Sequence, residues 1–121
     1  MSFMFINLSN HPSRYWEERQ MEAARCYGDV LDLPFPTVAP DADIQELQNL
    51  AHDCLQKILS VGEANSITVH IMGEMTLTFV IVKLLKEMGI RCVASTTERK
   101  TTYTADGTKV SEFSFVKFRE Y

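Results

Sequence analysis

Residues 3–8 read Phe-Met-Phe-Ile-Asn-Leu, a nearly continuous apolar run. Such a run is typical of a strand that is covered on both faces of its sheet, as in parallel sheets. Turn and capping residues follow over 7–13, where Pro12 suits a first helical position. An amphipathic helix should then run to Tyr27 and stop at Gly28. The start of the chain therefore predicts a central β-strand followed by a helix.

The rest of the chain repeats this alternation of strand and helix. Strands are expected over 29–35, 67–72 and 90–94, and helices from a cap at Asp41 or Asp43 to Gly62 and over 76–88. Residues 98–104 and 109–119 flank Ala-Asp-Gly, which is a hairpin signal. We therefore expect an α/β fold, a Rossmann-like open three-layer sandwich. Its mostly parallel sheet of about five strands should take the order 2-1-3-4, with a C-terminal antiparallel β-hairpin at the far edge.

The chain has 121 residues, 45% of them hydrophobic, and this size predicts a single domain over 1–121. The longest apolar run, residues 79–82, is far shorter than the ~20 residues of a membrane span, so we expect no membrane contact. The N-terminus lacks a basic stretch before its apolar run, which disfavours a signal peptide and indicates the cytoplasm. Cys26, Cys54 and Cys92 are widely spaced, and we expect reduced, buried thiols.

The net charge of −4 argues against a protein that coats duplex DNA. The charge is nevertheless divided along the chain. Residues 29–66 carry seven acids against Lys57 alone, whereas residues 91–121 carry six bases and four acids. An anionic ligand is therefore expected near the first and last strands rather than near the second helix, although ordinary surface charge explains the division equally well.

Two polar loops should face each other where the first and third strands end. Open α/β sheets bind ligands at this switch point, outside the carboxyl ends of the strands. The loops cover residues 7–14 and 72–78, and each leads into a helix N-terminus, whose free N–H groups favour phosphate or carboxylate. A third polar cluster, residues 95–100, follows the fourth strand.

The first loop is unusually polar for one that leaves an apolar strand. Asn7 lies inside the strand end, where its amide could read a base or a sugar. Ser9 and Asn10 could do the same, or could simply cap the helix. His11 and Arg14 are candidates for contact with phosphate.

The second loop offers fewer groups. Gly73 permits close backbone approach, and Thr76 is either a hydroxyl donor or a plain N-cap. Glu74 is either repelled by a bound anion or acts as a general base. His70 lies between apolar neighbours in the third strand, and we expect a core histidine with satisfied hydrogen bonds.

The third cluster adds hydroxyl groups and cations. Thr97 could bind a ligand, although threonine is also common in strands. Arg99 and Lys100 could meet a phosphate, although exposed hairpins often carry such charges to protect an edge. Trp16 and Gln20, one and two turns into the first helix, could line the same cleft.

Several enzyme classes lack their sequence motifs here. The chain has no G-x-G-x-x-G after its first strand, no G-x-x-x-x-G-K-[ST] and no G-x-S-x-G. No metal-ligand spacing appears either, so we expect no metal and no cofactor. Any catalysis would have to rest on positioning and hydrogen bonding.

The loop Asn7-Leu8-Ser9-Asn10-His11, the turn Gly73-Glu74-Met75-Thr76 and the segment Ser95-Thr96-Thr97-Glu98-Arg99 together resemble a CRISPR-associated Rossmann-fold (CARF) domain of type III CRISPR defence. The resemblance implies a homodimer that binds a cyclic oligoadenylate in a shared cleft. A stand-alone member would either cleave the ring without a metal or sequester it. The resemblance assigns catalytic roles to His11, Arg14 and Glu74, and ligand binding to Asn7, Ser9, Asn10, Gly73, Thr76, Thr97 and Arg99.

Two other readings remain open. The chain could be a non-catalytic nucleotide-binding module that keeps the ring intact. It could also be a dimeric interaction protein without a small ligand. In that case the polar loops are helix caps, and the apolar helix over 76–88 is the functional surface.

Overall fold

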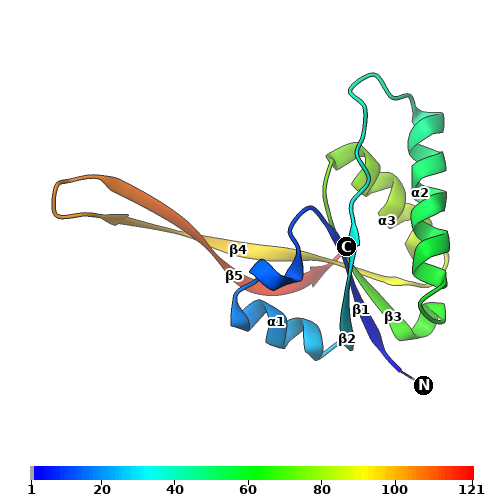
Figure 1. The fold of residues 1–121 in the computed structure, drawn as a ribbon, viewed down its shortest axis with the longest axis horizontal. Coiled ribbons are helices and arrows are strands. Elements are labelled where there is room, and N and C mark those ends of the chain that lie inside the picture. The colour runs from blue at the N-terminus through cyan, green and yellow to red at the C-terminus, as the bar shows by residue number, and fades with distance from the viewer. Residues whose placement is uncertain (1) are drawn as a thin grey trace.

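The computed structural model describes residues 2–121, and over these residues it shows an α/β fold with a five-stranded mixed sheet and three α-helices (Figure 1). The strands are β1 (Met4–Ser9), β2 (Asp29–Pro34), β3 (Ile67–Met72), β4 (Arg91–Tyr103) and β5 (Lys109–Glu120). The helices are α1 (Glu18–Arg25), α2 (Ile44–Leu59) and α3 (Met75–Glu87). The strand order is β2-β1-β3-β4-β5, with β1 to β4 parallel and β5 antiparallel to β4, so the predicted order is confirmed.

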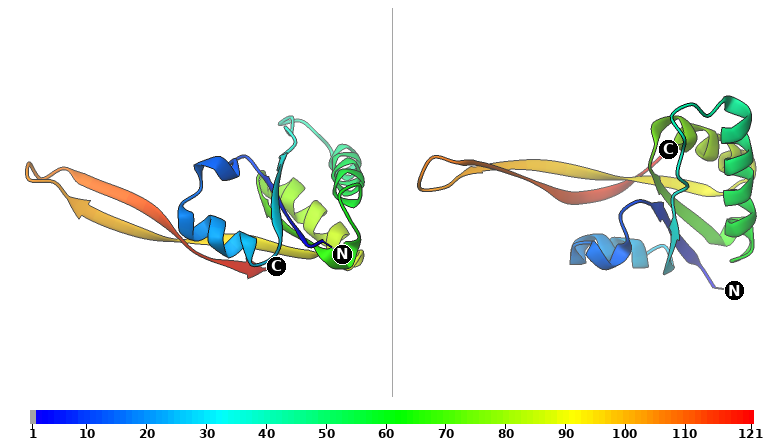
Figure 2. Two further views of the ribbon diagram at one scale, coloured as in Figure 1. Left: turned by 60° about the horizontal axis from the view of Figure 1, so that its bottom comes forward. Right: turned by 45° about the horizontal axis from the view of Figure 1, so that its top comes forward.

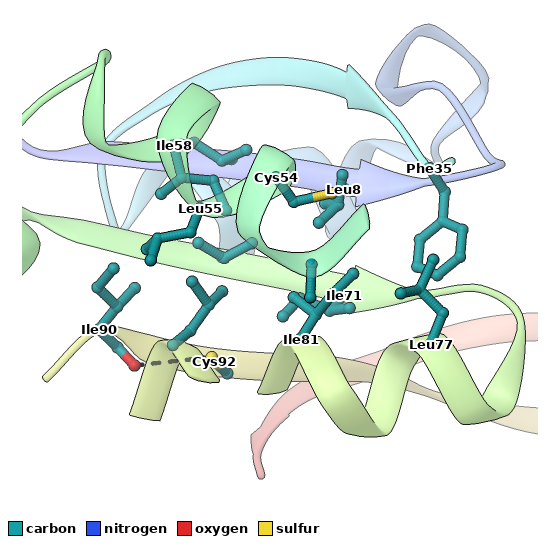
Figure 3. Close-up of a cluster of buried hydrophobic side chains, with 14 of the residues drawn as sticks. Leu8, Phe35, Cys54, Leu55, Ile58, Ile71, Leu77, Ile81, Ile90 and Cys92 are labelled. Atoms are coloured by element: carbon teal, nitrogen blue, oxygen red, sulfur yellow. Dashed lines mark hydrogen bonds between the residues drawn. The ribbon is translucent and has the colours of Figure 1, made fainter. Parts of the chain in front are cut away.

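One face of the sheet packs against α2 and α3 (Figure 3). Leu8 of β1 and Ile71 of β3 point to this face, where they meet Ile58 of α2 and Ile81 of α3. All four side chains are at most 1% exposed. Because alternate residues of a strand point to opposite faces of the sheet, the remaining side chains of β1 and β3 lie on its other face.

The other face is covered by α1 (Figure 2), which packs there against an aromatic cluster. Phe5 of β1 lies 4.9 Å from Phe118 and 6.3 Å from Trp16, measured between ring centroids. Phe115 and Tyr27 extend the same cluster. Tilted and edge-on contacts of this kind stabilise a core beyond the area that they bury.

The helix expected to run from the loop at Ser13 to Tyr27 is interrupted, and this prediction is wrong. Ser13–Tyr15 form a single 3₁₀ turn, Trp16 is extended with ψ 149°, and α1 begins only at Glu18. The extended backbone accompanies the burial of the Trp16 ring in the aromatic cluster, so tertiary packing prevails over local helix propensity.

Gly28 stands between α1 and β2 at a point where the chain passes close to β1. Its φ is 153°, and a Cβ atom at this position would lie 2.3 Å from the carbonyl oxygen of Phe3. Only glycine fits such a close approach. At the start of α2, the Asp43 carboxylate accepts a hydrogen bond from the Glu46 N–H at 2.9 Å, which identifies Asp43 rather than Asp41 as the cap.

Strands β4 and β5 continue far beyond the other strands as a two-stranded arm (Figure 1). The fourth strand was expected to end at Ala94, and this end is wrong, whereas the hairpin expected between residues 98–104 and 109–119 is confirmed. The pairing continues through a shift between Thr96 and Thr97 to Tyr103, and the side chains of 97–103 are exposed. Residues 95–102 contain four threonines, which favour extended backbone whether or not the strand is buried.

The cysteines only partly follow the prediction. Cys54 and Cys92 are buried free thiols, and burial raises the pKa of Cys92 to about 12. Cys26 is exposed at the end of α1, so its predicted burial is wrong. No helix between residues 2 and 121 is long and apolar enough to cross a bilayer.

Candidate functional site

A cavity of ≈ 500 Å³ lies at the carboxyl ends of β1 and β3, on the face of the sheet that α1 covers. We call it the strand-end cavity. It is lined by Ser9, Asn10, His11, Tyr15, Trp16, Glu17, Gln20, His70, Met72, Ser95, Thr97, Phe113 and Phe115. Its position is the one that the topology of an open α/β sheet favours for ligands.

Four residues named from the sequence as site candidates meet in this cavity. Ser9, Asn10 and His11 come from the loop after β1, and Thr97 comes from β4 across the sheet. Trp16 and Gln20 also line it, as expected from the sequence. Asn7 does not line the cavity, because its side chain is 1% exposed beneath the loop.

The two predicted arginines lie outside the cavity lining. The Arg14 guanidinium lies 4.6 Å from the ring centroid of Tyr15 and donates a hydrogen bond to the Tyr15 hydroxyl at 3.2 Å. Because Tyr15 lines the cavity, Arg14 sits at its rim. Arg99 donates to the Ser111 hydroxyl at 3.2 Å on the arm. Glu17 is therefore the one residue with a permanent charge among the described lining residues.

The second predicted loop serves mainly to start α3. Glu74, rather than Thr76, caps this helix, because its carboxylate accepts from the Leu77 N–H at 2.8 Å and the Thr76 N–H at 3.1 Å. These bonds and the Thr76 hydroxyl lower the pKa of Glu74 and hold its carboxylate at the start of α3. A Cβ at Gly73 would lie 2.6 Å from the ring of Phe35, so this glycine makes room for core packing. None of these three loop residues lines the strand-end cavity.

Polar side chains form a row across the sheet beneath the cavity. In the strand register, Asp32 of β2 pairs with Asn7 of β1, and Asn7 pairs with His70 of β3. The Asn7 Nδ2 group donates to Asp32 Oδ1 at 3.0 Å, and Asn7 Oδ1 lies 2.8 Å from His70 Nδ1. On the far side of the imidazole, His70 Nε2 lies 3.2 Å from the Ser95 hydroxyl of β4. The row therefore runs Asp32, Asn7, His70, Ser95.

The partners of Asn7 determine where the protons lie in this row. Its amide nitrogen faces two acceptors, the Asp32 carboxylate and the carbonyl oxygen of His11, so its oxygen must face His70. That oxygen also accepts from the Ser9 hydroxyl at 2.8 Å. His70 must then carry its proton on Nδ1, and the bare Nε2 accepts from Ser95.

Burial keeps His70 neutral. Its side chain is 2% exposed, and loss of solvation lowers its pKa to about 4, with a smaller contribution from nearby His11. The expectation of a buried histidine with both ring nitrogens partnered is confirmed. The sequence did not reveal its contact with Ser95, because that contact depends on how β4 pairs with β3.

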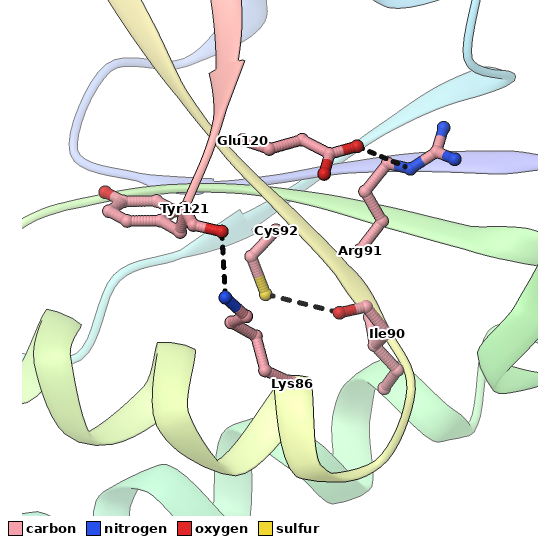
Figure 4. Close-up of polar contacts among 6 residues, drawn as sticks. All are labelled: Lys86, Ile90, Arg91, Cys92, Glu120 and Tyr121. Carbon is pink, nitrogen blue, oxygen red and sulfur yellow. Dashed lines mark hydrogen bonds and ion pairs between the residues drawn. The ribbon is translucent and has the colours of Figure 1, made fainter.

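A second cavity of ≈ 660 Å³ lies at the opposite end of the strands, beside the amino ends of β3 and β4. Its cations already have partners (Figure 4). Arg91 Nε lies 3.2 Å from Glu120 Oε1, and Lys86 Nζ donates to the carbonyl oxygen of Tyr121 at 2.9 Å. Although this cavity is larger, we favour the strand-end cavity, because it holds the Trp16 indole N–H, unpaired among the described residues, and lies at the strand ends at which such sheets bind ligands.

Two further observations limit the chemistry of the strand-end cavity. The described residues contain no group of three His, Cys, Asp or Glu side chains that could hold a metal ion. The Trp16 indole N–H is buried without a hydrogen-bond partner in the described structure. An unpaired buried donor is costly, so a ligand acceptor placed beside it would be favoured.

The comparison with known proteins identifies a family. A family model described as "Uncharacterized protein MJ1673 family" matches residues 4–119. No curated protein and no solved structure matches the chain. The matched residues include every strand and helix described above, from β1 to nearly the end of β5. The chain therefore belongs to the MJ1673 family of uncharacterized proteins.

Proposed function

We propose that this protein is a Rossmann-like CARF protein that binds a cyclic oligoadenylate in the strand-end cavity, in the cytoplasm. The observation that carries the proposal is the meeting of Ser9, Asn10, His11 and Thr97 in one cavity at the carboxyl ends of β1 and β3. Thr97 is far along the chain from the other three residues, which are consecutive. The resemblance assigns ligand binding to Ser9, Asn10 and Thr97, and a catalytic role to His11.

The cavity lining suits a nucleoside. The rings of Tyr15, Trp16 and Phe113 offer surfaces on which an adenine can stack, an interaction that needs no particular base sequence. The Asn10 amide and the hydroxyl of Thr97 supply hydrogen bonds for base edges and for the 2′-hydroxyl, the group by which proteins distinguish RNA from DNA.

The phosphates of the ligand would lie at the rim rather than inside. No described lining residue is Lys or Arg, and Glu17 contributes a negative charge. Arg14, which is held against Tyr15, is the nearest identified candidate for phosphate contact, with His11 inside the cavity. Arg99 lies on the arm and would reach a ligand that extends along β4.

A homodimer would place two such cavities together, and α3 is the proposed contact. Met75 is 82% exposed and Phe79 is 70% exposed, and with Met72, Val82 and others they line an apolar groove of ≈ 400 Å³. Met72 borders both this groove and the strand-end cavity. A partner seated on the groove would therefore lie beside the ligand.

Light scattering tests the dimer. We expect the Phe79→Lys substitution to give a monomer, because it places a charge in an apolar contact. Phe3 is a matched control, since it is 58% exposed at the opposite end of the strands, and Phe3→Lys should leave the dimer intact. A monomeric wild-type protein would overturn the proposed dimer.

Mixing the protein with radiolabelled cyclic tetra-adenylate tests the ligand. A shifted, intact ring indicates a sequestering module, and linear product in excess over protein indicates a ring nuclease, whose attacking group would be the ligand's own 2′-hydroxyl. Absence of any binding to cyclic tetra- or hexa-adenylate would refute the proposal. It would favour the interaction-protein reading, for which the exposed Met75 and Phe79 are the supporting observation.

A further inference from the structure

The Ser95 hydroxyl is the point at which the polar row reaches the strand-end cavity. Asp32 and Asn7 lie behind His70, and only Ser95 and the 2% exposed His70 of this row line the cavity. Ser95 has two acceptors within reach, His70 Nε2 at 3.2 Å and the Met72 sulfur at 2.9 Å. A thioether is a weak acceptor and an imidazole nitrogen a strong one, so the Ser95 proton belongs on the bond to His70.

We propose that Ser95 and His70 form a proton relay that removes the proton from a hydroxyl group of the bound ligand. The inference rests on the proposed function and adds the identity of the base, a role for which Glu74 was one candidate. With its own proton directed to His70, Ser95 presents lone pairs to the cavity. It can therefore accept a hydrogen bond from a ribose 2′-hydroxyl.

The relay opens the ring by one proton transfer and one exchange of bonds at phosphorus. The O–H bond of the 2′-hydroxyl breaks, and its proton moves to Ser95 Oγ while the Ser95 proton moves to His70 Nε2. The 2′-oxygen forms a bond to the adjacent phosphorus, and the bond from phosphorus to the 5′-oxygen breaks. The 5′-oxygen takes a proton from water, and His70 returns its proton to the solvent through Ser95. The product is a linear isomer of the ring with a 2′,3′-cyclic phosphate and a 5′-hydroxyl.

The residues behind His70 support this role. Asn7 Oδ1 holds the Nδ1 proton at 2.8 Å, which keeps Nε2 free to accept. The Asp32 carboxylate accepts a hydrogen bond from the Asn7 amide nitrogen at 3.0 Å, which keeps Asn7 Oδ1 turned toward His70. His70 acts through Ser95 and is therefore a positioning residue, whereas Ser95 would touch the ligand. The Ser9 hydroxyl bonded to Asn7 Oδ1 locks the same arrangement.

The test uses the full chain with cyclic tetra-adenylate under single-turnover conditions, with binding measured separately. We expect Ser95→Ala to slow ring opening by about 100-fold or more, the usual contribution of a general base. Ring affinity should change by less than about threefold, because the hydroxyl acts mainly in the reaction. Ser95→Thr keeps the hydroxyl and should recover most of the rate, which a merely structural role would not predict. Thr101→Ala, an exposed position further along β4, is the matched control.

The outcomes separate the two proposals. A ring that binds but is not opened by the wild-type protein, or is opened equally by Ser95→Ala, overturns the relay and leaves the binding function standing. A product heavier than the ring by one water, or a phosphoryl group attached to Ser95 in intact-protein mass spectrometry, also overturns it. If the ring does not bind at all, the proposed function itself fails. A ring analogue with 2′-O-methyl groups should bind the wild-type protein and remain intact.

Discussion

Asn7 Oδ1 lies 2.8 Å from His70 Nδ1, and this contact links the first strand of the sheet to the buried histidine of the third. The two residues are register partners in neighbouring parallel strands, so the backbone pairing itself brings them together. The hydrogen bond from Ser95 to His70 depends on this pair, because Asn7 fixes the imidazole proton on Nδ1 and leaves Nε2 open to Ser95.

Replacing Asn7 should therefore be costly. The Asn7→Leu variant has a similar shape but leaves the buried His70 Nδ1 without its acceptor and removes the amide donor to the carbonyl oxygen of His11. We expect a loss of about 2–4 kcal/mol in the free energy of unfolding, since buried polar groups would be left unpaired. Urea denaturation measures the change, and Asn10→Leu in the exposed loop is the control. A loss for Asn7→Leu no greater than that of the control would show that the network contributes little to stability.

Stability should depend on pH through His70. Its pKa falls from 6.5 in the unfolded chain to about 4 in the folded protein, so the unfolded state binds the proton more strongly between these values. The stability that depends on a neutral His70 is fully present above pH 6.5. It is lost as the pH falls to about 4, which lowers the free energy of unfolding by about 3 kcal/mol in all. The measurement is the free energy of unfolding at several pH values in wild type and in His70→Gln. Subtracting the two curves removes the other titrating groups, and a flat difference would contradict the low pKa.

The arm formed by β4 and β5 should add little to folding stability. A two-stranded ribbon without a covering core is marginally stable in water. We expect replacement of residues 101–111 by Asn-Gly to change the free energy of unfolding by less than about 1 kcal/mol, because Asn-Gly favours a tight hairpin. Phe113 and Phe115, which line the strand-end cavity, are retained. A large loss of stability would show that the arm is structurally required within a single chain.

Arg14 should matter for phosphate binding although it lies at the rim of the cavity. Arg14→Ala removes the cation held against Tyr15, and we expect about tenfold weaker binding of cyclic tetra-adenylate, or roughly 1.4 kcal/mol. The difference should shrink at high salt, because exposed charges are screened. Arg25→Ala, an exposed arginine at the end of α1, serves as the control. Equal affinities for the Arg14 variant and the control would remove Arg14 from the site.

The sequence predicted the sheet well, because its strands and stops are locally encoded. The apolar runs and the glycines after the helices located the elements. Their alternation, together with the order common to open α/β sheets, then predicted the order β2-β1-β3-β4-β5. The length of β4 could not be predicted from apolar patterning, because its outer half is a ribbon exposed on both faces. The break before α1 was missed because Trp16 is extended only to reach the aromatic cluster.

The candidate site was predicted only in part for a similar reason. Ser9, Asn10 and His11 follow one another in a loop, so a polar pattern was enough to identify them. His70 and Ser95 are separate positions on two strands, and their 3.2 Å contact follows from strand register rather than from any local motif. A polar residue at the same-facing position of three adjacent strands, as with Asp32, Asn7 and His70, is the signal that could have found the row.

The most direct test of the proposed site is a titration of ¹⁵N-labelled protein with cyclic tetra-adenylate, followed by amide chemical shifts. Binding in the strand-end cavity predicts the largest shifts at residues 9–11 and 95–97, together with the Trp16 indole N–H. Shifts confined to residues 64–68 and 89–92, which line the cavity at the opposite end of the strands, would contradict the proposed site, as would a spectrum that does not change.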